Sequence, residues 1–251
     1  MTDSGFISDH FQKEEGYWWH VSKREMVLSC IGHLFGSKNN SLKTLDVGCG
    51  TGFLTKRLED HGTAIGLDSS EESLLYGRKR GVSNLCRFHL SSQRLPFRDE
   101  AFQLVLALDI FEHLEDDRAV LAELRRVMQW GGRLILTVPA FQWLWGGWDE
   151  LLGHRRRYSL REISRRISSA GFRIKNVSYI FCFIFPLAVL VRFVKGFIYR
   201  FGGKYSSDFI PLPGVINDML IRIGRWERSI LARHSLPFGL SILCVAEKEA
   251  R

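Results

Sequence analysis

The sequence predicts an α/β protein built on a doubly wound, mostly parallel sheet. A short apolar run at 42–47 leads into three glycines and then into apolar residues at helical spacing, a pattern typical of a strand, a tight turn and a helix. Strand and helix patterns then alternate with short connections, which favours a parallel sheet. Expected strands are 42–47, 63–67, 85–90, 102–108, 133–139, 172–179 and 241–247, and expected helices are 53–58, 71–80, 116–129 and 160–170.

The turn after the first strand carries glycine at alternate positions, Gly48, Gly50 and Gly52. Glycine accepts positive φ and lets a ligand approach the backbone, while the next helix offers unpaired N–H groups to an anionic group. The dinucleotide fingerprint would need glycine where this chain has Phe53, and the phosphate-binding loop with its Lys-Ser/Thr ending is absent. The turn is therefore expected to hold a different small, partly anionic ligand.

Asp68 follows the second strand, 20 residues after Gly48. An acidic side chain at this distance binds ribose hydroxyls in nucleotide-binding α/β folds. Alternatively, Asp68 caps the helix at 71–80, a role that Ser69 or Ser70 can also fill.

The fourth strand ends in Leu108-Asp109, followed by Glu112 and His113. Ligands of open parallel sheets bind at this edge, and an imidazole accepts a hydroxyl proton near neutral pH. His113 is thus a candidate general base, unless it only starts the next helix and braces the loop. One carboxylate and one imidazole are too few ligands to predict a metal site.

The loop after Pro139 combines three tryptophans, including Trp145, with Arg155, Arg156, Arg157 and Tyr158. Aromatic faces and guanidinium groups suit a sugar ring with a nearby phosphate, or a nucleotide. We expect substrate binding there; a solvated arginine run beside a small satellite core is the alternative.

The segment 181–240 separates the last two expected strands. An uncharged run at 179–191, which begins just before this segment, is too short to span a bilayer. From Arg192 onward, aromatic and aliphatic residues share one helical face and basic residues the other, which is typical of a helix in a membrane interface. A lid helix over the site is the other interpretation, and both can hold. A further basic helix is expected at 216–234.

Composition separates the chain into two electrostatic halves. Residues 1–150 carry 17 Lys and Arg against 21 Asp and Glu, whereas residues 151–251 carry 18 against 6. The basic half suggests an anionic partner such as a membrane surface. Five scattered cysteines indicate neither a disulfide framework nor a zinc site, and no signal peptide is visible, so a cytoplasmic protein is expected.

The string Asp46-Val-Gly48-Cys-Gly50-Thr-Gly52, with Asp68, Leu95-Pro-Phe97 and Glu112-His113 following in order, resembles the motifs of class I S-adenosylmethionine-dependent methyltransferases of the type 11/12 kind. The resemblance implies a Rossmann-like, seven-stranded mixed sheet (41–180 and 241–251), an N-terminal helical lid (1–40) and a helical insertion (181–240). It implies S-adenosyl-L-methionine as cofactor, and Ser91 stands where the family usually has an acidic residue. The cofactor-binding residues expected by resemblance are Trp19, Arg24, Asp46, Gly48, Cys49, Gly50, Gly52, Asp68, Ser69, Ser91, Ser92, Gln93, Leu108 and Asp109.

The acceptor is less constrained by the sequence. The Gly153-His154-Arg-Arg-Arg-Tyr-Ser string resembles one in uncharacterised bacterial members associated with surface glycan or lipid-linked sugar synthesis, which makes His154 a second candidate base. We expect O-methylation of a glycan, a lipid-linked sugar or a related small hydroxyl acceptor, by a protein that associates peripherally with the inner face of the membrane. An isoprenoid quinone or lipid precursor is the alternative acceptor, and a non-catalytic cofactor sensor or membrane adaptor is the alternative class. No recognised RNA-binding module is visible, so no nucleic acid partner is expected.

Overall fold

A computed structural model describes residues 13–36, 41–90, 94–200 and 211–249. Ser91, Ser92 and Gln93, three of the expected cofactor-binding residues, lie outside these ranges.

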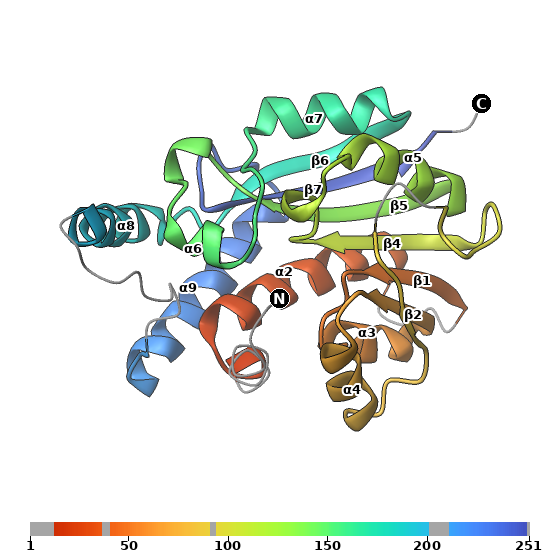
Figure 1. Ribbon diagram of the computed structural model, residues 1–251, viewed down its shortest axis with the longest axis horizontal. Coiled ribbons are helices and arrows are strands. Elements are labelled where there is room, and N and C mark those ends of the chain that lie inside the picture. Colours follow the sequence, from red (N-terminus) through yellow and green to blue (C-terminus); the bar gives the residue numbers. More distant parts are fainter. Residues whose placement is uncertain (1–12, 37–40, 91–93, 201–210, 250–251) are drawn as a thin grey trace.

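A seven-stranded mixed sheet forms the centre of the molecule, with strand order β3-β2-β1-β4-β5-β7-β6 (Figure 1). Strands β1 to β5 run parallel, and β7 is antiparallel to both β5 and β6. The order reverses between β1 and β4, and ligands of doubly wound sheets bind outside the carboxyl ends of strands at such a reversal. The strands are β1 (Leu42–Val47), β2 (Gly62–Asp68), β3 (Leu85–Arg87), β4 (Phe102–Leu108), β5 (Met128–Pro139), β6 (Phe172–Ile180) and β7 (Ser241–Lys248).

Two hydrophobic cores cover the two faces of this sheet. Along β4, Val105 and Ala107 belong to one core, and Leu104 and Leu106 belong to the other, as the alternation of side chains in a strand requires. The first core includes residues of α5 (Asp117–Val127) and α7 (Leu160–Ser169), and the second includes residues of α2 (Trp18–Phe35), α3 (Phe53–Leu58) and α9 (Gly214–Leu231). The other α-helices within the described ranges are α4 (Glu71–Lys79), α6 (Gly147–Leu151) and α8 (Phe185–Arg200).

Helix α9, which lies between β6 and β7 in the sequence, packs against α2. Helix α9 lies along α2, where Glu25 forms ion pairs with Arg225 and Arg228. The Asn217 side chain accepts a hydrogen bond from the Trp18 amide and donates one to the Gly16 carbonyl. Figure 1 shows α8 projecting beyond the end of the sheet, away from α5 and α7. The expected lid and insertion thus lie side by side.

Several element boundaries differ from the sequence predictions. The helix expected to reach residue 129 ends at Val127, and β5 begins at Met128 because Gly131, at φ +74°, lies in a bulge between the Phe102–Met128 and Leu104–Arg133 pairs. The strand expected at 85–90 stops at Arg87. Helix α8 starts at Phe185 rather than at Arg192, because Pro186 falls in its first turn, where a missing N–H costs no helical hydrogen bond.

Candidate active site

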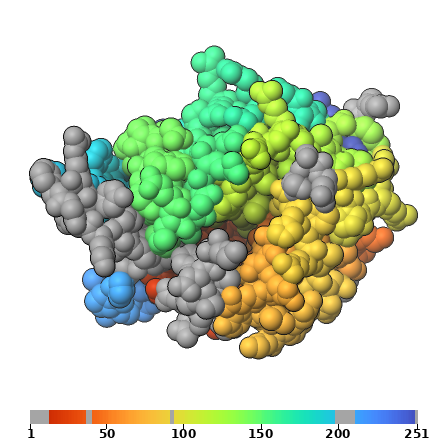
Figure 2. All heavy atoms as spheres, in the orientation of Figure 1, coloured from red at the N-terminus to blue at the C-terminus, as the bar shows by residue number. Residues whose placement is uncertain are grey.

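A cavity of about 610 Å³ opens at the carboxyl ends of β1, β2 and β4. Figure 2 shows the surface hollowed between the orange residues around α3 and α4 and the green residues that follow β5. Side chains of α2 and α8 complete its lining. The cavity therefore joins the glycine turn to the expected lid and insertion.

The glycine turn has the backbone that its sequence predicts. Gly48, Gly50 and Gly52 all have positive φ, of 74°, 54° and 68°. A Cβ on Gly48 would also lie 2.8 Å from the Ile110 side chain, so a larger residue would have to displace Ile110 as well as adopt a strained backbone conformation. The amide of Gly50 donates to Asp68 at 2.8 Å, which ties the turn to the end of β2.

Two carboxylates, Asp46 and Asp68, line the cavity beside this turn. Asp46 accepts a hydrogen bond from Thr55 at 2.6 Å, and its burial raises its pKa to about 6. Asp68 accepts hydrogen bonds from the amides of Gly50 and Ser70. Ser70, not Asp68, caps α4.

Helix α2 contributes a row of cavity-lining side chains on one face. Trp19 stacks on Phe181 with ring centroids 4.1 Å apart, and Arg24 lies over the Phe53 ring at 4.1 Å. Lys23, which the sequence motifs did not indicate, forms an ion pair with Asp109. Burial alone would raise the pKa of Asp109, but the charge of Lys23 and a hydrogen bond from Thr137 hold it below its usual value.

The structure brings together the two histidines that the sequence placed 41 positions apart. The rings of His113 and His154 meet edge to face with centroids 4.8 Å apart, and both line the cavity. Nδ1 of His154 lies 2.8 Å from Oδ1 of Asp149, a fully buried carboxylate of α6. Burial alone raises the pKa of Asp149, but His154, Arg157 and Arg192 lower it to about 2. An ionised Asp149 therefore fixes the orientation of His154.

Glu112 and His113 sit in a turn where burial shifts both groups toward their neutral forms. Burial and the charge of Asp109 raise the pKa of Glu112 well above its ordinary value. Burial and the neighbouring His154 lower the pKa of His113, so its imidazole is neutral near pH 7. A neutral imidazole at the cavity wall can accept a proton or bind a cation.

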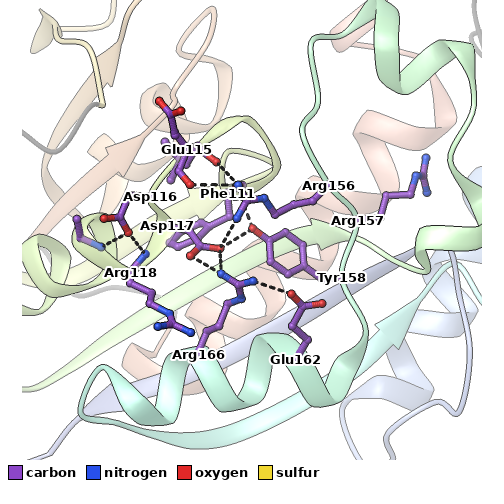
Figure 3. A network of polar contacts seen from close by, with 12 residues as sticks. Phe111, Glu115, Asp116, Asp117, Arg118, Arg156, Arg157, Tyr158, Glu162 and Arg166 are labelled. Carbon is purple, nitrogen blue, oxygen red and sulfur yellow. Dashed lines mark hydrogen bonds and ion pairs between the residues drawn. The ribbon is translucent and has the colours of Figure 1, made fainter.

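The arginine loop mainly performs a structural role (Figure 3). Asp117 forms ion pairs with Arg156 and Arg166 and accepts a hydrogen bond from the fully buried Tyr158 hydroxyl at 2.9 Å. Arg157 points to the opposite side, as alternation along an extended chain requires, and its Nε lies 2.8 Å from Asp149. The alternative of a solvated arginine run holds for Arg155, which is exposed, but not for Arg157, which is buried.

Most described residues of the expected cofactor site line the cavity, and most of the expected substrate site does not. Gly52 and Ser69 do not line the cavity. Gly52 instead provides the positive φ at which the turn enters α3. Of the expected substrate-binding residues, Arg157 lines the cavity, whereas Trp145, Arg155, Arg156 and Tyr158 do not. The lining residues that were expected are Trp19, Arg24, Asp46, Gly48, Cys49, Gly50, Asp68, Leu108, Asp109, His113, His154 and Arg157.

An apolar wall that the sequence motifs did not indicate closes the other end of the cavity. Ile184 precedes α8, and Leu187, Ala188 and Val191 follow at helical spacing along its inner face. The i, i+3, i+4, i+7 spacing of these residues in the sequence could have indicated a common helical face. The run at 179–191 is apolar on all sides of a helix, however, so the sequence does not distinguish the face that lines the cavity from the others.

Comparisons with known proteins agree with this geometry. Residues 45–136 match the family model of the methyltransferase domain. A relative from Mycolicibacterium smegmatis, described as a probable S-adenosylmethionine-dependent methyltransferase, is 27% identical over 171 residues, covering 67% of this chain and 64% of the relative. A demethylmenaquinone methyltransferase from Shouchella clausii is 32% identical over 115 residues, covering 40% and 49%. The chain thus spans less than two thirds of the length of these relatives.

Solved structures support the fold. A chain from the complex between the Haloferax volcanii Trm112 methyltransferase activator and a putative methyltransferase superposes with a TM-score of 0.62 at 18% identity, over 98% of this chain and 97% of that one. A methyltransferase from Aquifex aeolicus gives a TM-score of 0.53 at 24% identity, over 71% and 93%. The glycine turn, the sheet order and these similarities lead to one conclusion: this chain contains a class I S-adenosylmethionine-dependent methyltransferase domain.

Proposed function

We propose that this protein transfers the methyl group of S-adenosylmethionine to a hydroxyl of a lipid-linked acceptor. The observation that carries the proposal is the single cavity that extends from the glycine turn, past His113 and His154, to the apolar inner face of α8. A polar cofactor fits the first end, and a lipid chain fits the last. The histidine pair lies between them, where the acceptor hydroxyl would meet the methyl group.

The reaction needs alignment and removal of one proton. The hydroxyl oxygen forms a bond to the methyl carbon, the sulfur keeps the electrons of the breaking bond, and the hydroxyl proton passes to a base. Alignment of the two reactants supplies much of the acceleration. His154, held by Asp149, and the neutral His113 are the groups proposed to activate the hydroxyl.

The charges at the cavity favour the lipid part of the acceptor over a phosphate. Arg157 and Arg192 line the cavity but both contact Asp149. The expected recognition of a phosphate by the arginine loop therefore has little support. Among the glycan acceptors, we propose a sugar that is attached to a lipid carrier.

An isoprenoid quinone precursor is a second candidate acceptor. The same apolar wall at Leu187 and Val191 suits an isoprenoid chain. Relatives that share the methyltransferase region include demethylmenaquinone methyltransferases.

We also propose that α8 brings the protein to the cytoplasmic surface of an anionic membrane. Leu190, Phe193 and Val194 expose more than half of their surface, and the segment 181–240 carries eight Lys and Arg against three Asp and Glu. Basic charge beside exposed apolar side chains is what an anionic lipid surface binds. Within the described ranges, no helix is long and apolar enough to cross a bilayer.

Labelled S-adenosylmethionine tests the proposed reaction. The protein is incubated with separate lipid, glycan and RNA fractions of cells, and we expect label in the lipid fraction. The double variant His113→Ala/His154→Ala should lose the transfer, while His33→Ala, a change in the last turn of α2 outside the cavity, should keep it. Label confined to RNA or to lipid-free glycans would contradict the lipid-linked acceptor. Cofactor binding with no transfer to any fraction would favour the non-catalytic class.

A further inference from the structure

Three side chains with metal-ligating atoms converge at the wall of the cavity. Glu112 and His113 come from the turn after β4, and His154 comes from the loop between α6 and α7. One ligand atom from each lies within 4.8 Å of the other two. Segments far apart in the chain thus deliver one carboxylate and two imidazoles to one point.

Both imidazoles are oriented by a second partner. Nδ1 of His154 lies 2.8 Å from a carboxylate oxygen of Asp149, which accepts a hydrogen bond from the ring N–H, so Nε2 keeps its lone pair. His113 forms a hydrogen bond with the backbone of Gly153. Histidines that bind metals show this arrangement, in which one ring nitrogen binds the metal and the other donates to a carboxylate or a backbone carbonyl.

Glu112 provides the second, independent observation. The residue is 1% exposed, and its Oε2 atom has no hydrogen-bond partner within the part of the chain that the structure describes. Among the described residues, Asp109 and Asp149 have cationic partners, whereas no ion pair involves Glu112. An unsatisfied buried carboxylate oxygen is costly, and a bound ion is one of the few ways to satisfy it.

We propose that Glu112, His113 and His154 bind a divalent transition cation of the Zn²⁺ type, with an open coordination position facing the cavity. Two imidazoles and one carboxylate suit Zn²⁺ and its neighbours, whereas Mg²⁺ and Ca²⁺ prefer oxygen ligands. Tetrahedral bonds of about 2.1 Å place ligand atoms about 3.4 Å apart, so binding needs side-chain shifts of about an ångström from the present separation.

The use of this cation in catalysis rests on the proposed function. A hydroxyl bound at the open position would have a lowered pKa, and its proton would leave to water. The alkoxide oxygen then forms the bond to the methyl carbon while the sulfur keeps the electron pair, so no oxidant or reductant is needed. In this arrangement the histidines act as ligands, and the cation takes over the activation assigned above to a free imidazole.

Direct metal titration tests the site without any acceptor. The full chain is stripped with a chelator, dialysed and titrated with Co²⁺ while its visible absorption is recorded, and Zn²⁺ is then added as competitor. We expect saturation at one equivalent, displacement by Zn²⁺ and no displacement by equimolar Mg²⁺. Glu112→Gln and His154→Ala should each weaken binding by at least tenfold, while His33→Ala should bind like the unchanged protein.

Cofactor affinity and circular dichroism of each variant confirm that it folds, so a loss of Co²⁺ binding reports on the ligands. Absence of saturable Co²⁺ binding in the unchanged chain would overturn the proposal. It would also be overturned if Glu112→Gln and His154→Ala bound Co²⁺ as tightly as the unchanged chain. The two proposals fail separately. Methyl transfer by the chelator-stripped protein would support the proposed methyltransferase activity and reject a catalytic role for the cation. Metal binding without methyl transfer to any fraction would support the metal site and reject the proposed activity.

Discussion

The two ends of the cavity are assembled in different ways. At the cofactor end, the glycine turn and its two carboxylates come from consecutive segments, β1, the turn and β2, within residues 42–68. The acceptor end comes from distant segments, with His113 after β4, His154 before α7 and Leu187 in α8. A local sequence motif can encode the first end, but only tertiary packing can build the second. Asp149 is the residue on which the acceptor end depends most, since it contacts His154, Arg157 and Arg192.

The largest effect is expected at Asp149. Asp149→Ala leaves the buried Arg157 without its carboxylate, so the free energy of unfolding should fall by about 3–5 kcal/mol. Urea denaturation measures this change. Glu150→Ala, an exposed neighbour in α6, is the matched control and should stay within about 0.5 kcal/mol of the unchanged protein. Equal stability of the two variants would show that the acceptor end does not depend on this carboxylate.

At the cofactor end, Asp46→Asn should weaken binding of S-adenosylmethionine without dismantling the acceptor end. The family resemblance implies that Asp46 helps to hold the cofactor's amino group, and loss of one such charge-assisted contact is worth about 1.5–3 kcal/mol, or roughly tenfold to a hundredfold in affinity. Calorimetric titration gives the dissociation constant. An unchanged constant would remove Asp46 from the cofactor site.

The same carboxylate predicts a pH dependence of cofactor binding. The folded protein holds the pKa of Asp46 at about 6, above its ordinary value of 3.8, so the fold favours the protonated form. The contribution of Asp46 to the free energy of unfolding is therefore fully present below about pH 3.8 and is lost as pH rises through about 6. Because the ammonium group favours the ionised form, affinity should increase between pH 5 and pH 7. Asp46→Asn should flatten this increase, and a steep increase that persists in the variant would assign it to another group.

A smaller effect is expected at Tyr158, which was predicted to bind the substrate. Its hydroxyl bonds to Asp117 and to the Phe111 carbonyl, both away from the cavity. Tyr158→Phe should therefore lower the free energy of unfolding by about 1.5 kcal/mol, with methyl transfer unchanged under conditions where the variant is folded. A transfer rate that falls while stability is kept would restore the substrate role.

The smallest effect is expected on the outer face of α8. Phe193→Ser removes apolar surface from the proposed membrane contact, and a loss of about 1 kcal/mol corresponds to roughly fivefold weaker binding to anionic vesicles. Vesicle sedimentation at low and high salt measures it. Ser235→Ala, on the loop after α9, is the control. Equal sedimentation of both variants would count against α8 as the contact.

Sequence reasoning predicted the sheet closely because period-two and helical patterns are local. The positions of all seven strands were anticipated, although β5 starts earlier because of the bulge at Gly131. The three glycines in the turn after β1 have the positive φ that their spacing suggested.

The acceptor end was less predictable because burial and pairing decide it. Arg156, Arg157 and Tyr158 are adjacent in sequence, yet two of them turn to Asp117 and one turns to Asp149. Lys23 lines the cavity one helical turn after Trp19, but no sequence pattern predicts its ion pair with Asp109. Such pairings form between segments far apart in the chain, so no motif reports them.

The most direct test of the account measures both ends of the cavity in one variant. In His113→Ala/His154→Ala, the affinity for S-adenosylmethionine and the rate of methyl transfer to the lipid fraction are determined together. We expect affinity within about twofold of the unchanged protein and transfer reduced by at least about a hundredfold, the size of effect expected when hydroxyl activation is lost. Transfer at the unchanged rate, or a loss of cofactor affinity equal to the loss of transfer, would contradict the division of the cavity into a cofactor end and an acceptor end.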